Sequence, residues 1–428
     1  MKLITAVRGF KDILPSEVGK WRYIEDKAGE IFGNFGLHEI RIPVLEKTEL
    51  FKRSIGEATD IVEKEMYTFL DRGDEYLTLR PEATASVIRA YLQHSMHAAD
   101  HVVKLFTIGP MFRRERPQKG RFRQFHQINA ELIGMDDPRA DAELILILIC
   151  FLKSVGMLDP RLEINSLGCS GCRPSFREKI TGFLKDKKDG LCGDCLRRLE
   201  TNPLRVFDCK QESCREIIAE VPQLLDYICP ECRDHFGKVK EYLTALDISF
   251  AVNAKMVRGL DYYTRTAFEV TTGSEGAQNA VAGGGRYDGL IKELGGPDIP
   301  GAGFAIGVER LISLLPMKDE EFAAHPRLFI AALGDEAGRF AYTLCNRLRM
   351  QGIRAEMDYL GRSLKSQMKR SNKLNSSHTL ILGEREMLEK KAELRDMKTG
   401  TQETLSLDNI NNIVKRMNIE HPTSNIEC

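Results

Sequence analysis

The chain has 428 residues, of which 42% are hydrophobic and 29% charged, as in ordinary globular proteins. Its 62 basic and 62 acidic residues cancel, which excludes nucleic-acid binding driven by an overall positive field and leaves that role to local patches. The length predicts two or three domains. The charged N-terminus argues against a signal peptide, and the longest apolar run, at residues 144–152, is too short to span a membrane. We therefore expect a cytoplasmic protein without membrane contact.

The first 160 residues alternate helical and strand-like patterns. The apolar periodicity predicts helices at residues 21–33, 83–94 and 138–152 and strands at residues 38–45 and 76–80. The third helix is apolar on all sides, so we expect it to be buried.

Residues 108–134 predict a β-hairpin with a basic turn. Six cations crowd around the Pro-Gln-Lys-Gly sequence, namely Arg113, Arg114, Arg116, Lys119, Arg121 and Arg123. After the turn Phe125, Gln127, Asn129 and Glu131 alternate, which points them to one face of a sheet. The cations suit a polyphosphate and the buried polar groups suit a small ligand with donors, although an exposed hairpin with a solvated turn explains this segment alone equally well.

Three more polar segments share this character, at residues 79–84, 258–266 and 301–310. Taken alone, Glu82 could merely complement a helix dipole and Thr84 merely cap the helix. Together the segments supply arginines for phosphates, carboxylates for an amine or imidazole, and tyrosines for a polar ring. No P-loop or Ser-His-Asp pattern is present, so the chemistry implied is phosphate-centred and driven by positioning and charge stabilisation.

Residues 161–250 form a Cys- and Arg-rich insertion with helical stretches. A chain without export features is not expected to use cysteines for disulfides, whereas paired thiolates at these spacings can close tetrahedral zinc sites. Two four-cysteine sets are available, written in chain order as Cys169, Cys172, Cys192 and Cys195, then Cys209, Cys214, Cys229 and Cys232. We expect structural Zn²⁺ here, with unliganded thiols as the alternative.

Five sequence motifs resemble those of bacterial histidyl-tRNA synthetases, which are class II aminoacyl-tRNA synthetases, and the resemblance runs almost end to end. HEIRIPVLEKTELF, MFRRERPQKGRFRQFHQ and GAGFAIGVERL resemble class II motifs 1, 2 and 3. LRPEATA and RGLDYYTRTAFE resemble the two segments that define histidine specificity.

The resemblance implies an α/β (α+β) fold with two domains. Residues 1–325 would form the class II antiparallel-sheet catalytic domain, with the Cys-rich helical insertion at about 168–240. Residues 326–428 would form an α/β anticodon-binding domain, in which the basic stretch 361–374 is a local patch for a phosphate backbone.

The resemblance also implies residue roles. Histidine would be bound by Glu82, Ala83, Thr84, Gln127, Glu131, Arg258, Tyr262 and Tyr263, with the loop through Arg286 and Tyr287 closing that side. ATP, entering with Mg²⁺, would be bound by Arg113, Glu115, Arg121, Phe125 and Arg310. The acceptor end of tRNA would meet Arg116, Gln118 and Lys119. Arg258 and Arg113 would be catalytic, because they would stabilise charge at the α-phosphate.

The implied function is the two-step ligation of L-histidine to its tRNA through histidyl-adenylate, by a homodimer. The first alternative is a synthetase-like regulatory subunit of histidine biosynthesis, but such proteins typically lack the C-terminal domain and lose the ATP and tRNA motifs. A synthetase for another amino acid would leave Glu131 unpaired against an apolar side chain. An RNA-binding protein without catalysis would not need the phosphate-binding arginines.

Overall fold

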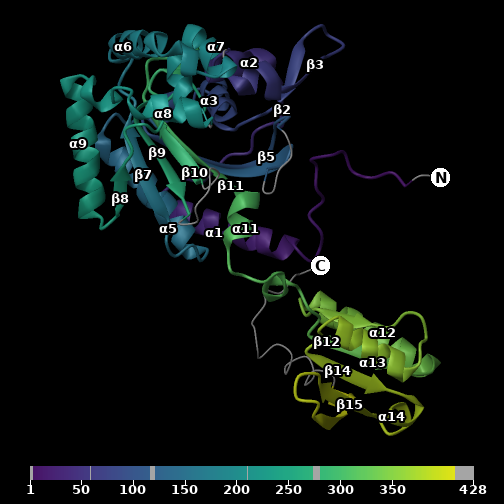
Figure 1. Cartoon of the computed structure of the whole chain (residues 1–428). Coiled ribbons are helices and arrows are strands. Elements are labelled where there is room, and N and C mark those ends of the chain that lie inside the picture. The colour runs from purple at the N-terminus through teal and green to yellow at the C-terminus, as the bar shows by residue number, and fades with distance from the viewer. Residues whose placement is uncertain (1–2, 58, 116–120, 210, 273–279, 410–428) are drawn as a thin grey trace. The chain divides into compact units, whose positions relative to one another are not determined.

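The computed structural model describes residues 3–57, 59–115, 121–209, 211–272 and 280–409. The chain divides into two compact units, Met1–Glu321 and Phe322–Cys428, each with its own apolar core (Figure 1). The first unit contains all the segments predicted to form the substrate site, and the second contains the basic stretch.

A large sheet forms the centre of the first unit. Its described strands run across the sheet in the order β1 (His38–Glu39), β5 (Val103–Phe112), β6 (Gln124–Ile133), β11 (Gly301–Gly307), β10 (Ala280–Arg286), β9 (Thr264–Thr271), β7 (Arg161–Ser166) and β8 (Phe250–Val252). All pairings from β5 to β7 are antiparallel, and the short strands β1 and β8 add in parallel at the two edges. The predicted antiparallel-sheet fold is therefore confirmed.

Helices surround this sheet (Figure 1). Four of them contribute to the main apolar core, namely α1 (Val18–Asn34), α5 (Pro138–Ser154), α9 (Pro230–Ala245) and α11 (Val308–Leu314). Further helices of the unit are α2 (Thr48–Ile55), α3 (Thr84–Gln93), α4 (Met96–Ala99), α6 (Arg173–Asp186), α7 (Gly193–Thr201), α8 (Glu212–Ala219) and α10 (Leu290–Glu293). The insertion consists of α6 to α8 and the short helical turns between them, and it leads into α9.

The two faces of β6 have different surroundings. Ile128, Ala130 and Leu132 are buried in the main core, together with α1 and α5. Gln127 and Asn129 instead line a cavity on the opposite face. Successive residues of a strand point to opposite faces, so the alternation read from the sequence is confirmed.

The strand predicted at residues 38–45 is wrong in its extent. The structure pairs only His38–Glu39 in the large sheet, and the chain then enters a three-stranded sheet ordered β2 (Leu45–Lys47), β4 (Tyr76–Leu79) and β3 (Tyr67–Leu70). Pro43, between the two strands, has no N–H to donate to a ladder. The buried Arg80 guanidinium donates instead to the carbonyls of Ile42 and Pro43, at 2.7 and 3.1 Å.

The second unit has its own sheet and helices. The strand order is β13 (Ala355–Met357), β12 (Leu328–Ala332), β14 (His378–Leu382), β15 (Lys391–Asp396) and β16 (Gln402–Ser406), and the helices are α12 (Asp335–Met350), α13 (Leu364–Lys373) and α14 (Glu384–Leu388). The basic stretch forms α13, where Gln367 and Ser371 are buried. The cations of α13 that remain exposed are Lys365, Lys369, Arg370 and Lys373.

Among the described helices of both units, none is long and apolar enough to cross a membrane.

Candidate active site

One cavity of about 300 Å³ collects side chains from widely separated segments. The start of α3, strand β6, the loop before β9 and the strands β9, β10 and β11 all contribute to its wall. The predicted substrate-binding residues among its lining are Glu82, Thr84, Arg113, Arg121, Gln127, Arg258, Tyr262 and Tyr263. The sheet and its neighbouring loops thus bring carboxylate, amide, phenol and guanidinium groups to one place.

Glu131 is a fully buried carboxyl on the same face of β6 as Gln127 and Asn129. Its two oxygens accept hydrogen bonds from Thr84 Oγ1 at 2.7 Å and from the Tyr287 hydroxyl at 2.6 Å. Burial raises the pKa of Glu131 to about 8, although the Tyr287 and Thr84 donors act to lower it. A buried carboxyl whose pKa lies near neutrality can share a proton with a basic group such as an imidazole.

Two glycines make room for this chemistry. Gly303 pairs with Glu131 in the ladder, and a Cβ at Gly303 would lie 1.8 Å from Glu131 Oε2. Gly283 pairs with Glu269 in the same sheet, and a Cβ there would lie 2.2 Å from Arg258 Nη2. The glycine-rich strands β10 and β11 are therefore needed for the side chains of the site to reach their positions.

The residues predicted to hold an amine differ in how their oxygens are used. Glu82 is buried and accepts the N–H groups of Thr84 and Ala85, at 2.7 and 2.9 Å, so it also stabilises the start of α3 as the alternative interpretation held. Burial raises the pKa of Glu82, and those two N–H groups oppose the shift. Gln127 Oε1, by contrast, is buried with no hydrogen-bond partner among the described residues. An unpaired buried acceptor costs about 1–3 kcal/mol, which a ligand donor would recover.

Ala83 has a different position from its neighbours. It is fully buried and packs in an apolar cluster with Ile42, Val87 and Met111. Its side chain therefore supports the helix that carries Thr84.

Arg258 is held at the cavity by a partner that the sequence did not suggest. Its Nη1 pairs with Glu269 Oε2 at 2.6 Å, and its Cζ lies 5.8 Å from the Tyr263 ring centroid. Glu269 also lines the cavity, and its signal in the sequence is a lone carboxylate between the apolar strand residues Phe268 and Val270. Arg258 Nε is buried without a hydrogen-bond partner in the described part of the chain.

Of the predicted ATP-binding residues, Arg113, Glu115 and Arg121 lie between β5 and β6, Phe125 lies on β6 and Arg310 lies on α11. Arg113 Nε donates to the Pro81 carbonyl at 2.8 Å, and its Cζ lies 5.4 Å from the Phe125 ring centroid. Arg121 Nη1 pairs with Glu115 Oε2 at 2.9 Å. Because Arg121 is partly exposed, such a pair is worth about 0.2–1 kcal/mol and is easily exchanged for a ligand.

Two further predictions concern Arg310 and the hairpin turn. Burial and the positive charge of Arg121 lower the pKa of Arg310. The predicted tRNA-facing residues Arg116, Gln118 and Lys119 lie outside the described residues.

Arg286 and Tyr287 separate, although the sequence interpretation grouped them. Tyr287 is buried, and its hydroxyl reaches Glu131. Arg286 is fully buried and points elsewhere, pairing with Asp141 and with Asp288 Oδ1 at 3.1 Å. Asp141 also contacts His235 Nε2 at 2.8 Å, so this network ties β10 to α5 and α9. Its role is structural, which corrects the expectation for Arg286.

The insertion cysteines form two clusters, but not the two sets written in chain order. The structure gathers Cys169, Cys172, Cys229 and Cys232 in one cluster and Cys192, Cys195, Cys209 and Cys214 in the other, with the ligand atoms of each within 4.8 Å of one another. The chain leaves the first cluster, forms α6 to α8 and returns at the start of α9, so the outer pairs enclose the inner ones. Spacing identifies the pairs, whereas the path of the helices decides which pairs meet.

Sulfur spacings within the clusters are those of a common centre. Cys169 Sγ and Cys172 Sγ are 3.6 Å apart, and Cys172 Sγ and Cys232 Sγ are 3.9 Å apart. In the other cluster Cys192 Sγ and Cys209 Sγ are 3.8 Å apart. Tetrahedral zinc with thiolates at about 2.3 Å places sulfur atoms about 3.8 Å from one another, so both clusters fit zinc.

Comparison with protein families covers nearly the whole chain. The family model described as histidyl-tRNA synthetase matches residues 9–311, and the model described as anticodon binding domain matches residues 327–417.

Individual relatives agree with these matches. The histidine–tRNA ligase of Geobacter metallireducens is 55% identical over 406 residues, covering 95% of this chain and 98% of the relative. That of Syntrophotalea carbinolica is 54% identical over 409 residues, covering 95% and 97%. The apo structure of S. aureus histidyl-tRNA synthetase is 37% identical with a TM-score of 0.81, covering 97% of this chain and all of that one.

A more distant structure shares the fold alone. A Bacillus halodurans protein named as an ATP phosphoribosyltransferase regulatory subunit/histidyl-tRNA synthetase is 20% identical, with a TM-score of 0.63, over 89% of this chain and 98% of that one.

Proposed function

The chain belongs to the histidyl-tRNA synthetase family, and we propose that it ligates histidine to its tRNA at the cavity lined by Gln127 and Arg258. The proposed ligase activity agrees with the names of the relatives that are 51–55% identical to this chain, which are histidine–tRNA ligases. The regulatory-subunit alternative is not favoured, because the relative that carries that name is only 20% identical and an anticodon-binding domain is present here. One observation carries the proposal: buried acceptors for an amine and buried phenols lie beside arginines suited to phosphates around one cavity.

On the histidine side, Gln127 Oε1 supplies the unpaired acceptor that an ammonium group needs. Glu82, which lines the same cavity, adds a carboxylate as a second acceptor, while Thr84 orients Glu131 through the 2.7 Å hydrogen bond. Glu131 and the buried phenol of Tyr263 then recognise the two ring nitrogens of the imidazole. A site built from polar groups rejects an apolar analogue strongly, because those groups would be left unpaired.

On the phosphate side, Arg258 stands where the carboxylate of histidine and the α-phosphate of ATP would meet. ATP enters as its Mg²⁺ complex, with Phe125 against the adenine ring and Arg113 at the α-phosphate. Arg121 and Arg310 bind the outer phosphates. These guanidinium groups neutralise the charge that develops when a carboxylate oxygen attacks phosphorus, which is electrostatic stabilisation of the transition state.

The reaction then proceeds in two steps. A carboxylate oxygen of histidine attacks the α-phosphorus, the bond to the β-phosphate oxygen breaks, and pyrophosphate leaves. A terminal ribose hydroxyl of tRNA next attacks the histidyl carbonyl, and AMP leaves with the bonding pair. The adenylate phosphate can accept the hydroxyl proton, so no side chain of the protein has to act as a general base.

Partners and domain limits complete the proposal. Residues 1–325 form the catalytic domain and residues 326–428 the anticodon-binding domain, where the exposed cations of α13 contact the tRNA backbone. Arg116, Gln118 and Lys119 face the acceptor end. The enzyme is a cytoplasmic homodimer, which light scattering of the purified chain and cell fractionation would test.

Charging of tRNA with labelled amino acids tests the function. The purified chain is expected to label tRNA with histidine and not with other amino acids. Labelling with a different amino acid, or none with any, would contradict the proposal.

We also propose that each cysteine cluster holds a structural zinc ion. The sulfur spacings support this, as do backbone N–H groups of Cys229 and Cys192 that donate to Cys172 Sγ and Cys214 Sγ, at 3.1 and 3.2 Å. Metal analysis of protein purified without chelator should find two zinc ions per chain, one for each cluster. Cys195→Ser should remove one of them, and only trace zinc in the parent protein would refute the assignment.

A further inference from the structure

The segment Arg258–Tyr263 carries much of the histidine side, yet it has no regular structure. It lies in the loop between β8 and β9, where the described residues form neither helix nor strand. Tyr262 and Tyr263 are buried, and both line the cavity with Arg258. Because no ladder of backbone hydrogen bonds fixes this loop, side-chain contacts from neighbouring elements must set its position.

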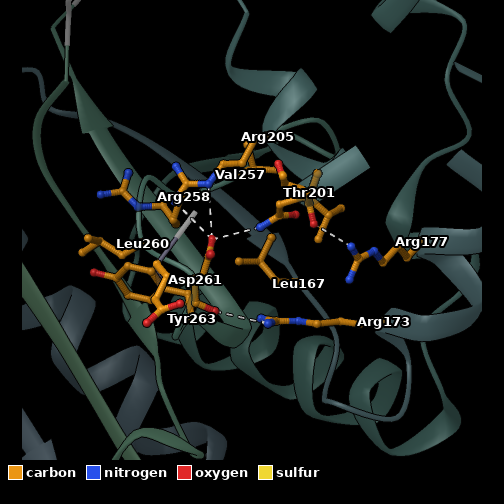
Figure 2. Close-up of a pocket in the computed structure, with 13 residues that line it drawn as sticks. Leu167, Arg173, Arg177, Thr201, Arg205, Val257, Arg258, Leu260, Asp261 and Tyr263 are labelled. Carbon is orange, nitrogen blue, oxygen red and sulfur yellow. Dashed lines mark hydrogen bonds and ion pairs between the residues drawn. The ribbon is translucent and has the colours of Figure 1, made fainter. Parts of the chain in front are cut away.

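Asp261, in the middle of the loop, is gripped by residues of the insertion. Arg205 donates to Asp261 Oδ1 through Nε at 3.2 Å and through Nη2 at 3.1 Å. Asn202 Nδ2 donates to the same oxygen at 3.1 Å, and Arg205 Nη2 also donates to the Gly259 carbonyl at 2.6 Å. Arg173 Nη1 reaches the Asp261 carbonyl at 3.3 Å (Figure 2).

The other side of Asp261 rests on the end of α2. Its N–H donates to the Ile55 carbonyl at 3.2 Å. Gly56 has φ +98°, and a Cβ there would lie 2.6 Å from Asp261 Oδ2. The Asp261 carboxylate therefore lies between α2 and the insertion. The side-chain hydrogen bonds that hold it come from the insertion, so their loss would free the carboxylate.

A second cavity, of about 430 Å³, lies between the insertion and this loop (Figure 2). Arg258 and Tyr263 line both this cavity and the substrate cavity. The loop thus separates the two cavities and is not packed tightly on the side of the insertion. Its position therefore depends on the few hydrogen bonds that the insertion makes to Asp261.

We infer that Asn202 and Arg205 of the insertion are positioning residues for histidine, acting through Asp261 on Arg258 and Tyr263. The inference rests on the proposed function and assigns the insertion a role in amino-acid binding, in addition to any contact with tRNA. Loss of the grip lets the loop move away from histidine. The residues proposed to bind adenine and the outer phosphates lie on other elements, and this loop supplies only Arg258 at the α-phosphate, so ATP binding changes much less than histidine binding.

The test measures histidine binding directly, by titration calorimetry of the full chain, together with the KM for ATP in pyrophosphate exchange. Arg205→Ala and Asp261→Asn should each raise the Kd for histidine by about 5- to 20-fold, because each weakens the charged hydrogen bonds that hold the loop without removing all of its contacts. Arg205→Ala combined with Asp261→Asn should be no worse than the stronger single variant, because both remove the same contact. Arg197→Ala, at an exposed arginine of α7, is the matched control and should leave both constants unchanged.

The outcomes separate this inference from the function itself. Unchanged histidine Kd in Asp261→Asn and in the milder variant Asn202→Ala, with normal binding by the parent protein, would overturn the inference alone. A rise in the histidine Kd that is matched by a rise in the ATP KM and a fall in the melting temperature would also overturn it, because such changes would indicate general damage to the fold. A parent protein that binds ATP but no histidine would overturn both.

Discussion

Glu131→Gln removes the carboxyl proposed to share a proton with the imidazole of histidine, while keeping the shape of the side chain. Glu131 is fully buried between hydroxyl donors at 2.7 and 2.6 Å, and its raised pKa keeps it protonated in the free protein. It becomes half of a charged pair when it gives its proton to the imidazole, and glutamine cannot form that pair. A hydrogen bond to a charged group is worth about 1.5–3 kcal/mol and a neutral one about 0.5–1.5 kcal/mol. The difference of about 1–2 kcal/mol corresponds to a rise of about 5- to 30-fold in the KM for histidine, since 1.4 kcal/mol is tenfold.

Pyrophosphate exchange at varied histidine and at varied ATP measures this effect. We expect the KM for ATP to stay within about twofold, because the proposed ATP contacts do not include Glu131. Glu178→Gln, at an exposed carboxylate of α6, is the control and should match the parent protein. An unchanged histidine KM in Glu131→Gln, or an equal rise in both KM values, would refute the assignment of this carboxylate to the imidazole.

Three further perturbations follow from buried charges and from the cysteine clusters. Because the pKa of Glu131 is raised from 4.5 to about 8, the folded state keeps a proton that the unfolded state has lost between these pH values. The free energy of unfolding, measured with urea, should therefore fall in the parent protein relative to Glu131→Gln as the pH rises from 4.5 to about 8. A difference between the two proteins that does not change with pH would contradict this. Arg286→Met leaves Asp141 buried with its ion pair broken and should cost about 3–5 kcal/mol in the free energy of unfolding, whereas a loss below about 1 kcal/mol would show that the pair is replaceable. Cys172 immediately precedes Arg173, whose guanidinium donates to the carbonyl of Asp261 in the loop proposed to bind histidine. Removal of the proposed zinc by a chelator should therefore weaken histidine binding severalfold in calorimetry before ATP binding changes. Equal histidine binding by the metal-free and the metal-loaded chain would contradict this connection between the cysteine cluster and the loop.

Much of the site could be predicted from local patterns. The alternation along β6 placed Gln127 and Glu131 on one face, because the strand period of two is set by backbone geometry. The structure, in turn, shows why glycines stand at 283 and 303, where a Cβ would collide with Arg258 and Glu131.

What the sequence could not supply depends on contacts between distant segments. The ion pair of Arg258 with Glu269 and the hydrogen bond from Tyr287 to Glu131 depend on how the fold places the loops that carry Arg258 and Tyr287 against strands β9 and β6. The pairing of the cysteine motifs depends on how α6 to α8 return the chain to its starting point, which spacing alone does not encode. Arg286 was misassigned for a similar reason: it is the last residue of β10 and pairs with Asp141 of α5, whereas Tyr287, just after the strand, reaches Glu131.

The most direct test of the central claim is histidine-dependent exchange of labelled pyrophosphate into ATP, by the parent protein and by Arg258→Ala. The account predicts exchange with histidine only, and a loss of about 10²–10³-fold in the variant, as for removal of one group that stabilises transition-state charge. Arg161→Ala, at an exposed arginine of β7, should behave as the parent protein. No exchange with any amino acid, or equal exchange in Arg258→Ala, would contradict the account.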